Sequence, residues 1–521
     1  MVKWWSKLIH RYELYIILFC IVMLLRIPTF YEPYWYGDEA IYLALGNSIR
    51  SGEIIYKDIV DHKTPLIYYF ASTGSQTMFK FIFALWMAIT SCGVWYLLKT
   101  ANLGRKLRIG ALGIFVLLTT IPALEGNIAN GELFVLGFVV FGLIVMSKTR
   151  LYQHIMNHTN ATQTMTHHLA LSKEWWLYLV TGLLFGGAVL TKVPAVFDLA
   201  FPGGIVILGL WYAITKGKWN LSVEHVVAGS LILLGVGVGV LASAGYFALL
   251  GALPEYLAFG WTYNFRYTEA FQINHSWAIF RFLYDTPAKM AFLAISGISL
   301  LIPSSIVSNR IKVGVFWLIA TAYALLLSSR PYPHYFQQMV LPVIWLITLL
   351  ISTKKLRDWI FGGFFLLYAL MSLVALNLRP YPTLSYYSNF FQFIFGQMTT
   401  REYRSSFNSY VNDVYTVGDL IRTSTDPADR IFVWGTNPML YAYSLRNPAG
   451  RFTVAFHIKD FDAHQESLDA IIETEPPVVV WMHAESDPFP ELRSYLQDHY
   501  VVTGVFDTLT LYRRTSVTSL R

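Results

Sequence analysis

The chain has 521 residues, of which 55% are hydrophobic, 16% aromatic and only 14% charged, and its mean hydropathy is +0.46. A soluble globular protein of this length needs more surface charge, so this class is excluded and most of the chain is expected to face lipid. The net charge of +7 is typical of membrane proteins with basic cytoplasmic loops, and we expect no nucleic-acid partner.

The N-terminal segment has the charge pattern of a signal peptide, with basic residues before the apolar run 14–25. The run ends at Arg26 and Pro28, without the small residues of a cleavage site. We therefore expect a retained first helix that begins in the cytoplasm.

Long apolar segments recur along the chain as far as residue 378. A spanning helix needs about 20 mainly apolar residues, because only a helix satisfies its own backbone polar groups in hydrocarbon. Lys or Arg residues occur in every connection predicted to be cytoplasmic, as the positive-inside rule requires. We predict about eleven transmembrane helices, at 12–30, 79–98, 107–124, 131–147, 175–191, 196–215, 225–250, 288–305, 312–328, 335–352 and 358–378.

The charged C-terminal region, residues 379–521, predicts a small extracytoplasmic α/β domain. Apolar runs at 430–435 and 477–481 are typical of buried strands, and 462–474 between them of a helix. No Gly-x-Gly-x-x-Gly follows a strand, which argues against nucleotide binding. The fold class predicted for the whole chain is an all-α polytopic membrane domain, 1–378, with this α/β domain attached.

The first external loop, 31–78, carries the most informative motifs. Asp38 and Glu39 follow the first span directly, and Asp58, His62 and Lys63 follow about twenty residues later. Adjacent acids can simply complement the macrodipole at a helix N-terminus. A loop that folds back on the bilayer would instead bring both clusters into one external pocket.

This pattern, Tyr-x-Asp-Glu followed by Asp-x-x-x-His-Lys-x-Pro-Leu, resembles the GT-C glycosyltransferases related to the protein O-mannosyltransferases and the lipid A aminoarabinose transferase. The resemblance extends loosely over nearly the whole chain, although the family often has a second Pro where Thr64 stands. It implies the GT-C fold and a sugar donor attached to undecaprenyl or dolichyl phosphate. For the location we expect the plasma membrane of a prokaryote. It also implies inversion at the anomeric carbon.

The resemblance assigns catalytic roles to the two adjacent acids. Asp38 would be the general base, because an inverting displacement needs one carboxylate within hydrogen-bond reach of the attacking hydroxyl. Glu39 would orient Asp38 or bind sugar hydroxyls, and a simple helix cap is the alternative. His62 and Lys63 would bind substrate beside them.

Cations are needed for the leaving lipid phosphate. Lys192 stands at the outer end of a span, where relatives commonly place such a lysine; snorkelling to the headgroups is the alternative. Arg330 and His334 match an Arg-x-x-x-His-Tyr pattern of relatives and are candidates for binding phosphate or sugar. Arg266, in the aromatic external loop 251–287, is a weaker candidate.

A second acid is expected in the external loop before the fourth span. Glu132 is our candidate for a sugar or acceptor contact, with Glu125 as a substitute and a helix-start acid as the alternative. Acids and histidines can hold a divalent ion, as in some GT-C enzymes, but we expect no metal cofactor. The His-containing stretch 154–168 is more typical of a solvated loop than of a metal site.

Two other functions compete with a glycosyltransferase. A transporter would place charges at mid-membrane and show paired broken helices, whereas the charges here gather at one face. A lipid-linked glycan polymerase or ligase would carry loop arginines for pyrophosphate. We therefore predict an inverting glycosyltransferase whose partners are a lipid-phosphate-linked sugar, membrane lipids, and a glycan, lipid or protein acceptor.

Overall fold

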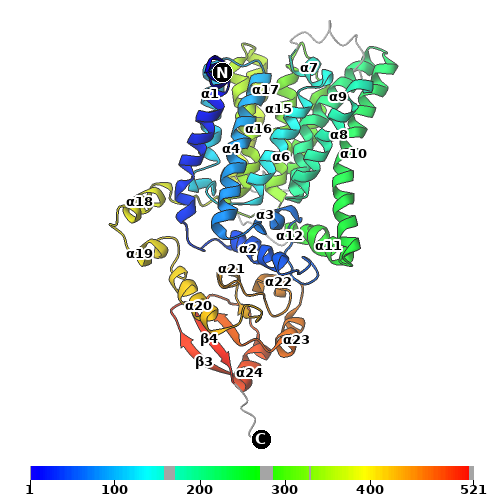
Figure 1. Cartoon of the computed structure of the whole chain (residues 1–521). Coiled ribbons are helices and arrows are strands. Elements are labelled where there is room, and N and C mark those ends of the chain that lie inside the picture. The colour runs from blue at the N-terminus through cyan, green and yellow to red at the C-terminus, as the bar shows by residue number, and fades with distance from the viewer. Residues whose placement is uncertain (1, 158–170, 270–285, 328–329, 516–521) are drawn as a thin grey trace. The chain divides into compact units, whose positions relative to one another are not determined.

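The computed structural model describes residues 2–157, 171–269, 286–327 and 330–515 (Figure 1). Most of the His-containing stretch 154–168 and much of the predicted loop 251–287 lie outside these ranges. The chain forms two compact units, which we name the helical unit and the sheet unit. The helical unit contains 1–26, 83–245 and 264–382, and the sheet unit contains 27–82, 246–263 and 383–521.

The helical unit is a bundle whose long helices lie side by side (Figure 1). Its centre is apolar: Trp317 and Trp345 are almost fully buried, and both rings contact Phe201. Its helices and 3-10 turns are α1 (Val2–Leu25), α4 (Gln76–Thr100), α5 (Arg105–Leu118), η2 (Pro122–Leu124), α6 (Gly131–Met146), α7 (Arg150–Asn157), α8 (Leu171–Val189), η3 (Val193–Leu199), α9 (Ala200–Thr215), α10 (Trp219–Leu249), α12 (Tyr263–Glu269), α14 (Thr286–Ile298), η5 (Ser299–Leu301), α15 (Asn309–Leu327), η6 (Pro333–Phe336), α16 (Gln337–Ser352) and α17 (Leu356–Ala375).

The predicted number of spans is confirmed only in part. Helices occur at all eleven predicted places, but within the described residues seven are long and apolar enough to cross a membrane, or eight if a pair bent by 93° is one span. That pair is α6 and α7, and the remaining predicted spans are α5, α8 and α14. These three helices are short or carry polar residues, so length and hydropathy alone do not qualify them.

The sheet unit contains a four-stranded sheet in the order β1-β2-β4-β3, with β1 parallel to β2 and β4 antiparallel to β2 and β3. The strands are β1 (Phe432–Trp434), β2 (Val478–Met482), β3 (Tyr500–Val505) and β4 (Leu509–Arg514). The strands predicted at 430–435 and 477–481 are therefore present. The helix predicted at 462–474 is α23 (His464–Thr474).

The predicted first external loop is itself largely structured. It contains η1 (Ile27–Tyr31), α2 (Gly37–Arg50) and α3 (Leu66–Ala71), and it belongs to the same unit as the sheet. The other helical elements of the sheet unit are α11 (Leu253–Leu257), the π-helix η4 (Ala258–Thr262), α18 (Thr383–Ile394), α19 (Thr400–Ser405), α20 (Val411–Ser424), α21 (Met439–Ser444), α22 (Ala455–Asp460) and α24 (Pro490–His499).

Candidate active site

Two adjacent acids occupy the first turn of α2. No side chain caps this helix, so the carboxylates of Asp38 and Glu39 lie beside its unsatisfied backbone N–H groups. Their environments differ: the Asp38 side chain is 28% exposed, whereas that of Glu39 is 3% exposed. Only Asp38 is accessible to a substrate in this arrangement.

Lys63 joins the two motif segments of the first loop. Its Nζ lies 3.6 Å from Asp38 Oδ2 and 3.8 Å from Asp61 Oδ2, and it stands 5.1 Å from the centre of the Tyr42 ring. Tyr42 and Asp38 belong to the same helix, so the lysine is held against the start of α2. The expected meeting of the two clusters is therefore present within the sheet unit.

Glu39 faces a different set of groups. Its Oε1 accepts a hydrogen bond from Gln76 Nε2 at 2.9 Å and lies 3.4 Å from Lys80 Nζ. Lys80 also pairs with Glu32 at 2.6 Å, and all three charged side chains are buried. This network joins the start of α2 to the first turns of α4, whose residues 76–82 belong to the sheet unit as well.

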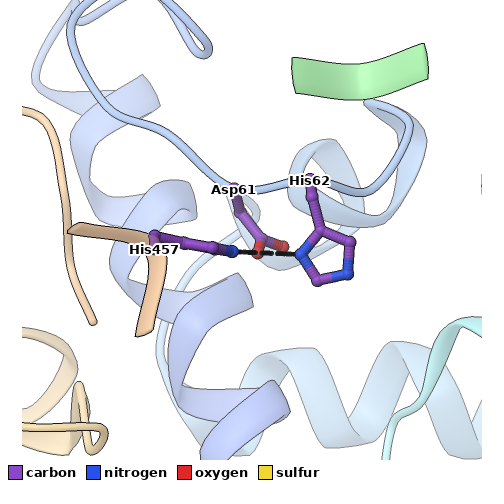
Figure 2. A group of neighbouring side chains, drawn as sticks. All are labelled: Asp61, His62 and His457. Atoms are coloured by element: carbon purple, nitrogen blue, oxygen red, sulfur yellow. Dashed lines mark hydrogen bonds and ion pairs between the residues drawn. The ribbon is translucent and has the colours of Figure 1, made fainter. Parts of the chain in front are cut away.

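Asp61, His62 and His457 converge beside Lys63 (Figure 2). His62 Nδ1 lies 3.1 Å from His457 Nε2 and 3.1 Å from Asp61 Oδ1, and the His457 nitrogen is 3.4 Å from the same oxygen. The second oxygen of Asp61 accepts a hydrogen bond from Tyr68 at 2.6 Å. The loop and α22 thus meet through three buried polar side chains.

Burial and neighbouring groups together set the protonation of this triad. Burial lowers the pKa of His457 to about 3 and also lowers the pKa of His62, in each case against the opposing effect of Asp61. Burial alone would raise the pKa of Asp61, but Lys63 and His62 hold it well below its ordinary value. Near neutral pH the triad therefore consists of one carboxylate and two neutral imidazoles.

The helical unit contains a second polar cluster, formed by Glu125, Glu132, Lys192 and His334. Lys192 donates a short hydrogen bond to Glu132, and His334 Nδ1 contacts Glu125. The other imidazole nitrogen lies 3.8 Å from Glu132 Oε1. Both acids are buried, and all four side chains are engaged with one another.

Local backbone geometry places these groups. The chain turns sharply at Glu125, which has a left-handed φ of +55°, and at Gly126, where a Cβ would lie 2.6 Å from the Thr119 carbonyl carbon. Arg26 donates hydrogen bonds to the carbonyl oxygens of Thr119 and Gly126 and holds the turn. Lys192 stands where α8 has ended and η3 begins, between the spans predicted at 175–191 and 196–215.

The remaining predicted residues differ in how close they are to these clusters. Arg330 stacks 4.0 Å from the Tyr267 ring centre, and Lys192 lies 4.3 Å from the Tyr335 ring centre, while the two tyrosine hydroxyls are 3.4 Å apart. Aromatic rings therefore connect Arg330 with the second cluster. Arg266 lies exposed on α12.

Several residues at these clusters were not predicted. Glu32 and Lys80 gave no motif signal, and His457 lies 395 residues from His62 in a stretch that reads as ordinary core. Glu125, expected only as a substitute for Glu132, lies next to His334 as Glu132 does. The sequence signal for the first network is a lysine near the start of a span, Lys80, because such a charge needs an acidic partner.

No protein-family model matches the sequence, and no curated protein is similar to it at a significant level. Solved structures do match. ArnT from Cupriavidus metallidurans, determined with bound undecaprenyl phosphate, matches with a TM-score of 0.54 and 12% identity over 98% of this chain and 99% of that chain.

The oligosaccharyltransferase of Archaeoglobus fulgidus also matches. Its structure tethered to an acceptor peptide gives a TM-score of 0.43 and 13% identity, over 98% of this chain and 75% of that chain. Its apo form gives a TM-score of 0.41 and 12% identity, over 97% and 75%. The full-length match to ArnT confirms the GT-C fold that the first-loop motif implied.

Proposed function

We propose that this protein is an inverting glycosyltransferase that moves a sugar from a polyprenyl phosphate, undecaprenyl or dolichyl, to an acceptor hydroxyl at the outer membrane face. The observation that carries the proposal is the contact between the partly exposed Asp38 carboxylate and Lys63, 3.6 Å apart on the motif loop of a GT-C fold. The undecaprenyl phosphate bound to ArnT supports a donor of the same chemical class.

In the proposed reaction Asp38 acts as general base. The acceptor oxygen attacks the anomeric carbon while its proton moves to the Asp38 carboxylate, and the bond from that carbon to the phosphate oxygen breaks. One displacement inverts the anomeric centre. The Lys63 ammonium, 3.6 Å from Asp38 Oδ2, orients the carboxylate that accepts the proton.

The leaving group is a lipid phosphate, whose growing negative charge needs cationic partners. We propose that Lys192 contacts this phosphate, with Arg330 and His334 as further donors of hydrogen bonds. Lys192 is already paired with Glu132, so binding of the donor would exchange one anionic partner for another. Glu132 would then be released to contact the sugar or the acceptor, as expected of it.

Glu39 is proposed to act through position alone. Its carboxylate is already shared between Gln76 and Lys80, and its side chain is buried. Because Glu39 anchors the first turn of α2, it positions the adjacent Asp38. A metal takes no part in the proposed transfer step.

The test is release or transfer of sugar from a panel of radiolabelled polyprenyl-phosphate sugars by the purified full-length protein. Wild type should turn over at least one donor, and Asp38→Asn should bind that donor without turnover. Asp469→Asn is the matched control, because Asp469 lies in the same unit on α23, outside the motif loop, and accepts a hydrogen bond from Gln465. It should keep activity.

Two results would contradict the proposal. Unchanged turnover in Asp38→Asn would remove this residue from the mechanism and shift attention to Glu132. Absence of turnover with every donor in wild type would contradict the transferase assignment and favour transport, which uptake into proteoliposomes would detect.

A further inference from the structure

The meeting point of Asp61, His62 and His457 brings together three potential ligand atoms, one from each side chain. Figure 2 shows both imidazoles turning a ring nitrogen toward the Asp61 carboxylate. The three atoms, His62 Nδ1, His457 Nε2 and Asp61 Oδ1, are separated by 3.1, 3.1 and 3.4 Å. Each belongs to a side chain that is at least nine-tenths buried.

These separations match one face of a tetrahedral zinc site. Zinc binds imidazole nitrogen and carboxylate oxygen at about 2.0–2.2 Å, so the ligand atoms of a tetrahedron lie about 3.3–3.6 Å apart. The observed triangle is only slightly smaller. An ion placed above its centre reaches all three atoms without a rearrangement of the backbone.

Hydrogen bonds alone satisfy the cluster less well. Asp61 Oδ1 accepts no hydrogen bond within the described part of the chain, although Oδ2 is bonded to Tyr68. If one of the two imidazole nitrogens carries a proton, that N–H can donate to the other two atoms. The lone pairs of those two atoms then face each other in a buried site, which is unfavourable. A divalent cation accepts electron density from all three at once.

We propose that Asp61, His62 and His457 bind a zinc ion that fastens the first loop to α22. Two imidazoles favour zinc over magnesium or calcium, which prefer oxygen ligands. The fourth position would hold water, as in a three-ligand zinc site. The site ties together residues 395 positions apart, and so it holds the loop that carries Lys63.

The same distances also fit a metal-free triad that shares one proton, and the experiment separates the two accounts. Full-length protein is purified in detergent through a tag without histidine, equilibrated with zinc, dialysed, and analysed for bound metal by mass spectrometry. About one zinc per chain is expected for wild type, with loss in Asp61→Asn and in His457→Ala.

His464→Ala is the matched control, since His464 lies in the same unit but pairs with Asp487 at 3.0 Å. It should retain zinc, and His457→Cys should retain it too, because a thiolate can replace the imidazole. Wild type without zinc, or His457→Ala with the wild-type amount, would overturn the proposal.

A second measurement covers the case in which the variants do not fold. Cobalt replaces zinc in wild type, and a tetrahedral site gives strong visible absorption whereas an octahedral surface site gives weak absorption. Strong bands that zinc abolishes are expected, and their absence would overturn the proposal. Neither measurement involves a sugar donor, so the outcome is independent of the transferase assignment.

Discussion

Two polar clusters use the same kinds of side chain in opposite ways: the Asp38–Lys63 pair at the start of α2, and the second cluster in the helical unit. At the start of α2, Lys63 faces Asp38, a carboxylate that is 28% exposed and therefore open to a substrate. In the helical unit, Lys192 and His334 face Glu132 and Glu125, which are each 3% exposed. A carboxylate with an open side can receive a proton, whereas a closed set of ion pairs must exchange partners before it binds anything.

The two adjacent acids of α2 differ in exposure in the same way. Asp38 and Glu39 are neighbours in sequence, yet only Asp38 is open, because Glu39 is turned into the Lys80 network. A buried ion pair is costly to break, because removing one partner leaves the other charge buried and alone.

The largest effect is expected for Asp38→Asn. Loss of a general base should lower kcat by about 10²- to 10⁴-fold, while donor affinity stays within about twofold because the neutral amide fits the same open position. Steady-state rates and donor binding should be measured on the same preparation. A parallel loss of donor binding would give Asp38 a binding role and remove the contrast with Lys192.

The next effect concerns stability rather than rate. Lys80→Met should lower the free energy of unfolding by about 3–5 kcal/mol, because Glu32 and Glu39 would be left buried without their cation. Thermal unfolding of the purified protein in detergent would record the change. Lys57→Met, at an exposed lysine of the same unit, is the control; equal midpoints for the two variants would show that the network contributes nothing.

A smaller effect is expected for Lys192→Met. If this lysine exchanges Glu132 for the donor phosphate, its loss should weaken donor affinity about 10- to 100-fold, the usual effect of one charge-assisted hydrogen bond. Titration with a polyprenyl phosphate would measure it, and Lys192→Arg should recover part of the affinity. Unchanged affinity would leave the Glu132–Lys192 pair with a purely structural role.

The smallest effect is expected for Arg266→Ala. Arg266 is exposed on α12, and surface substitutions away from special contacts usually change free energies by less than about 0.5 kcal/mol. Turnover and donor affinity should therefore stay within about twofold of wild type. A loss as large as that of Lys192→Met would add Arg266 to the binding residues and extend the second cluster.

Apolar length and local pattern were sufficient to predict where the long helices and the strands β1 and β2 lie, but not the helices of the first loop or the strands β3 and β4. Hydrocarbon requires long helices, so the run 225–250 appears as α10, and the apolar run 477–481 appears as the buried strand β2. The break at Lys192 and Pro194 is also local, because proline and a polar residue interrupt a helix from within. The resemblance of the first-loop motif to known enzymes likewise predicted the GT-C fold.

Only the tertiary structure decided which charges face one another. The pairs of Glu39 with Lys80, Glu125 with His334, and His62 with His457 join residues 41, 209 and 395 positions apart. No periodicity spans such distances, because a long-range contact depends on how whole elements pack. The sequence by itself therefore determined the elements and the motif loop, whereas packing decided which acid stays open, which are closed into ion pairs, and where three metal-binding side chains meet.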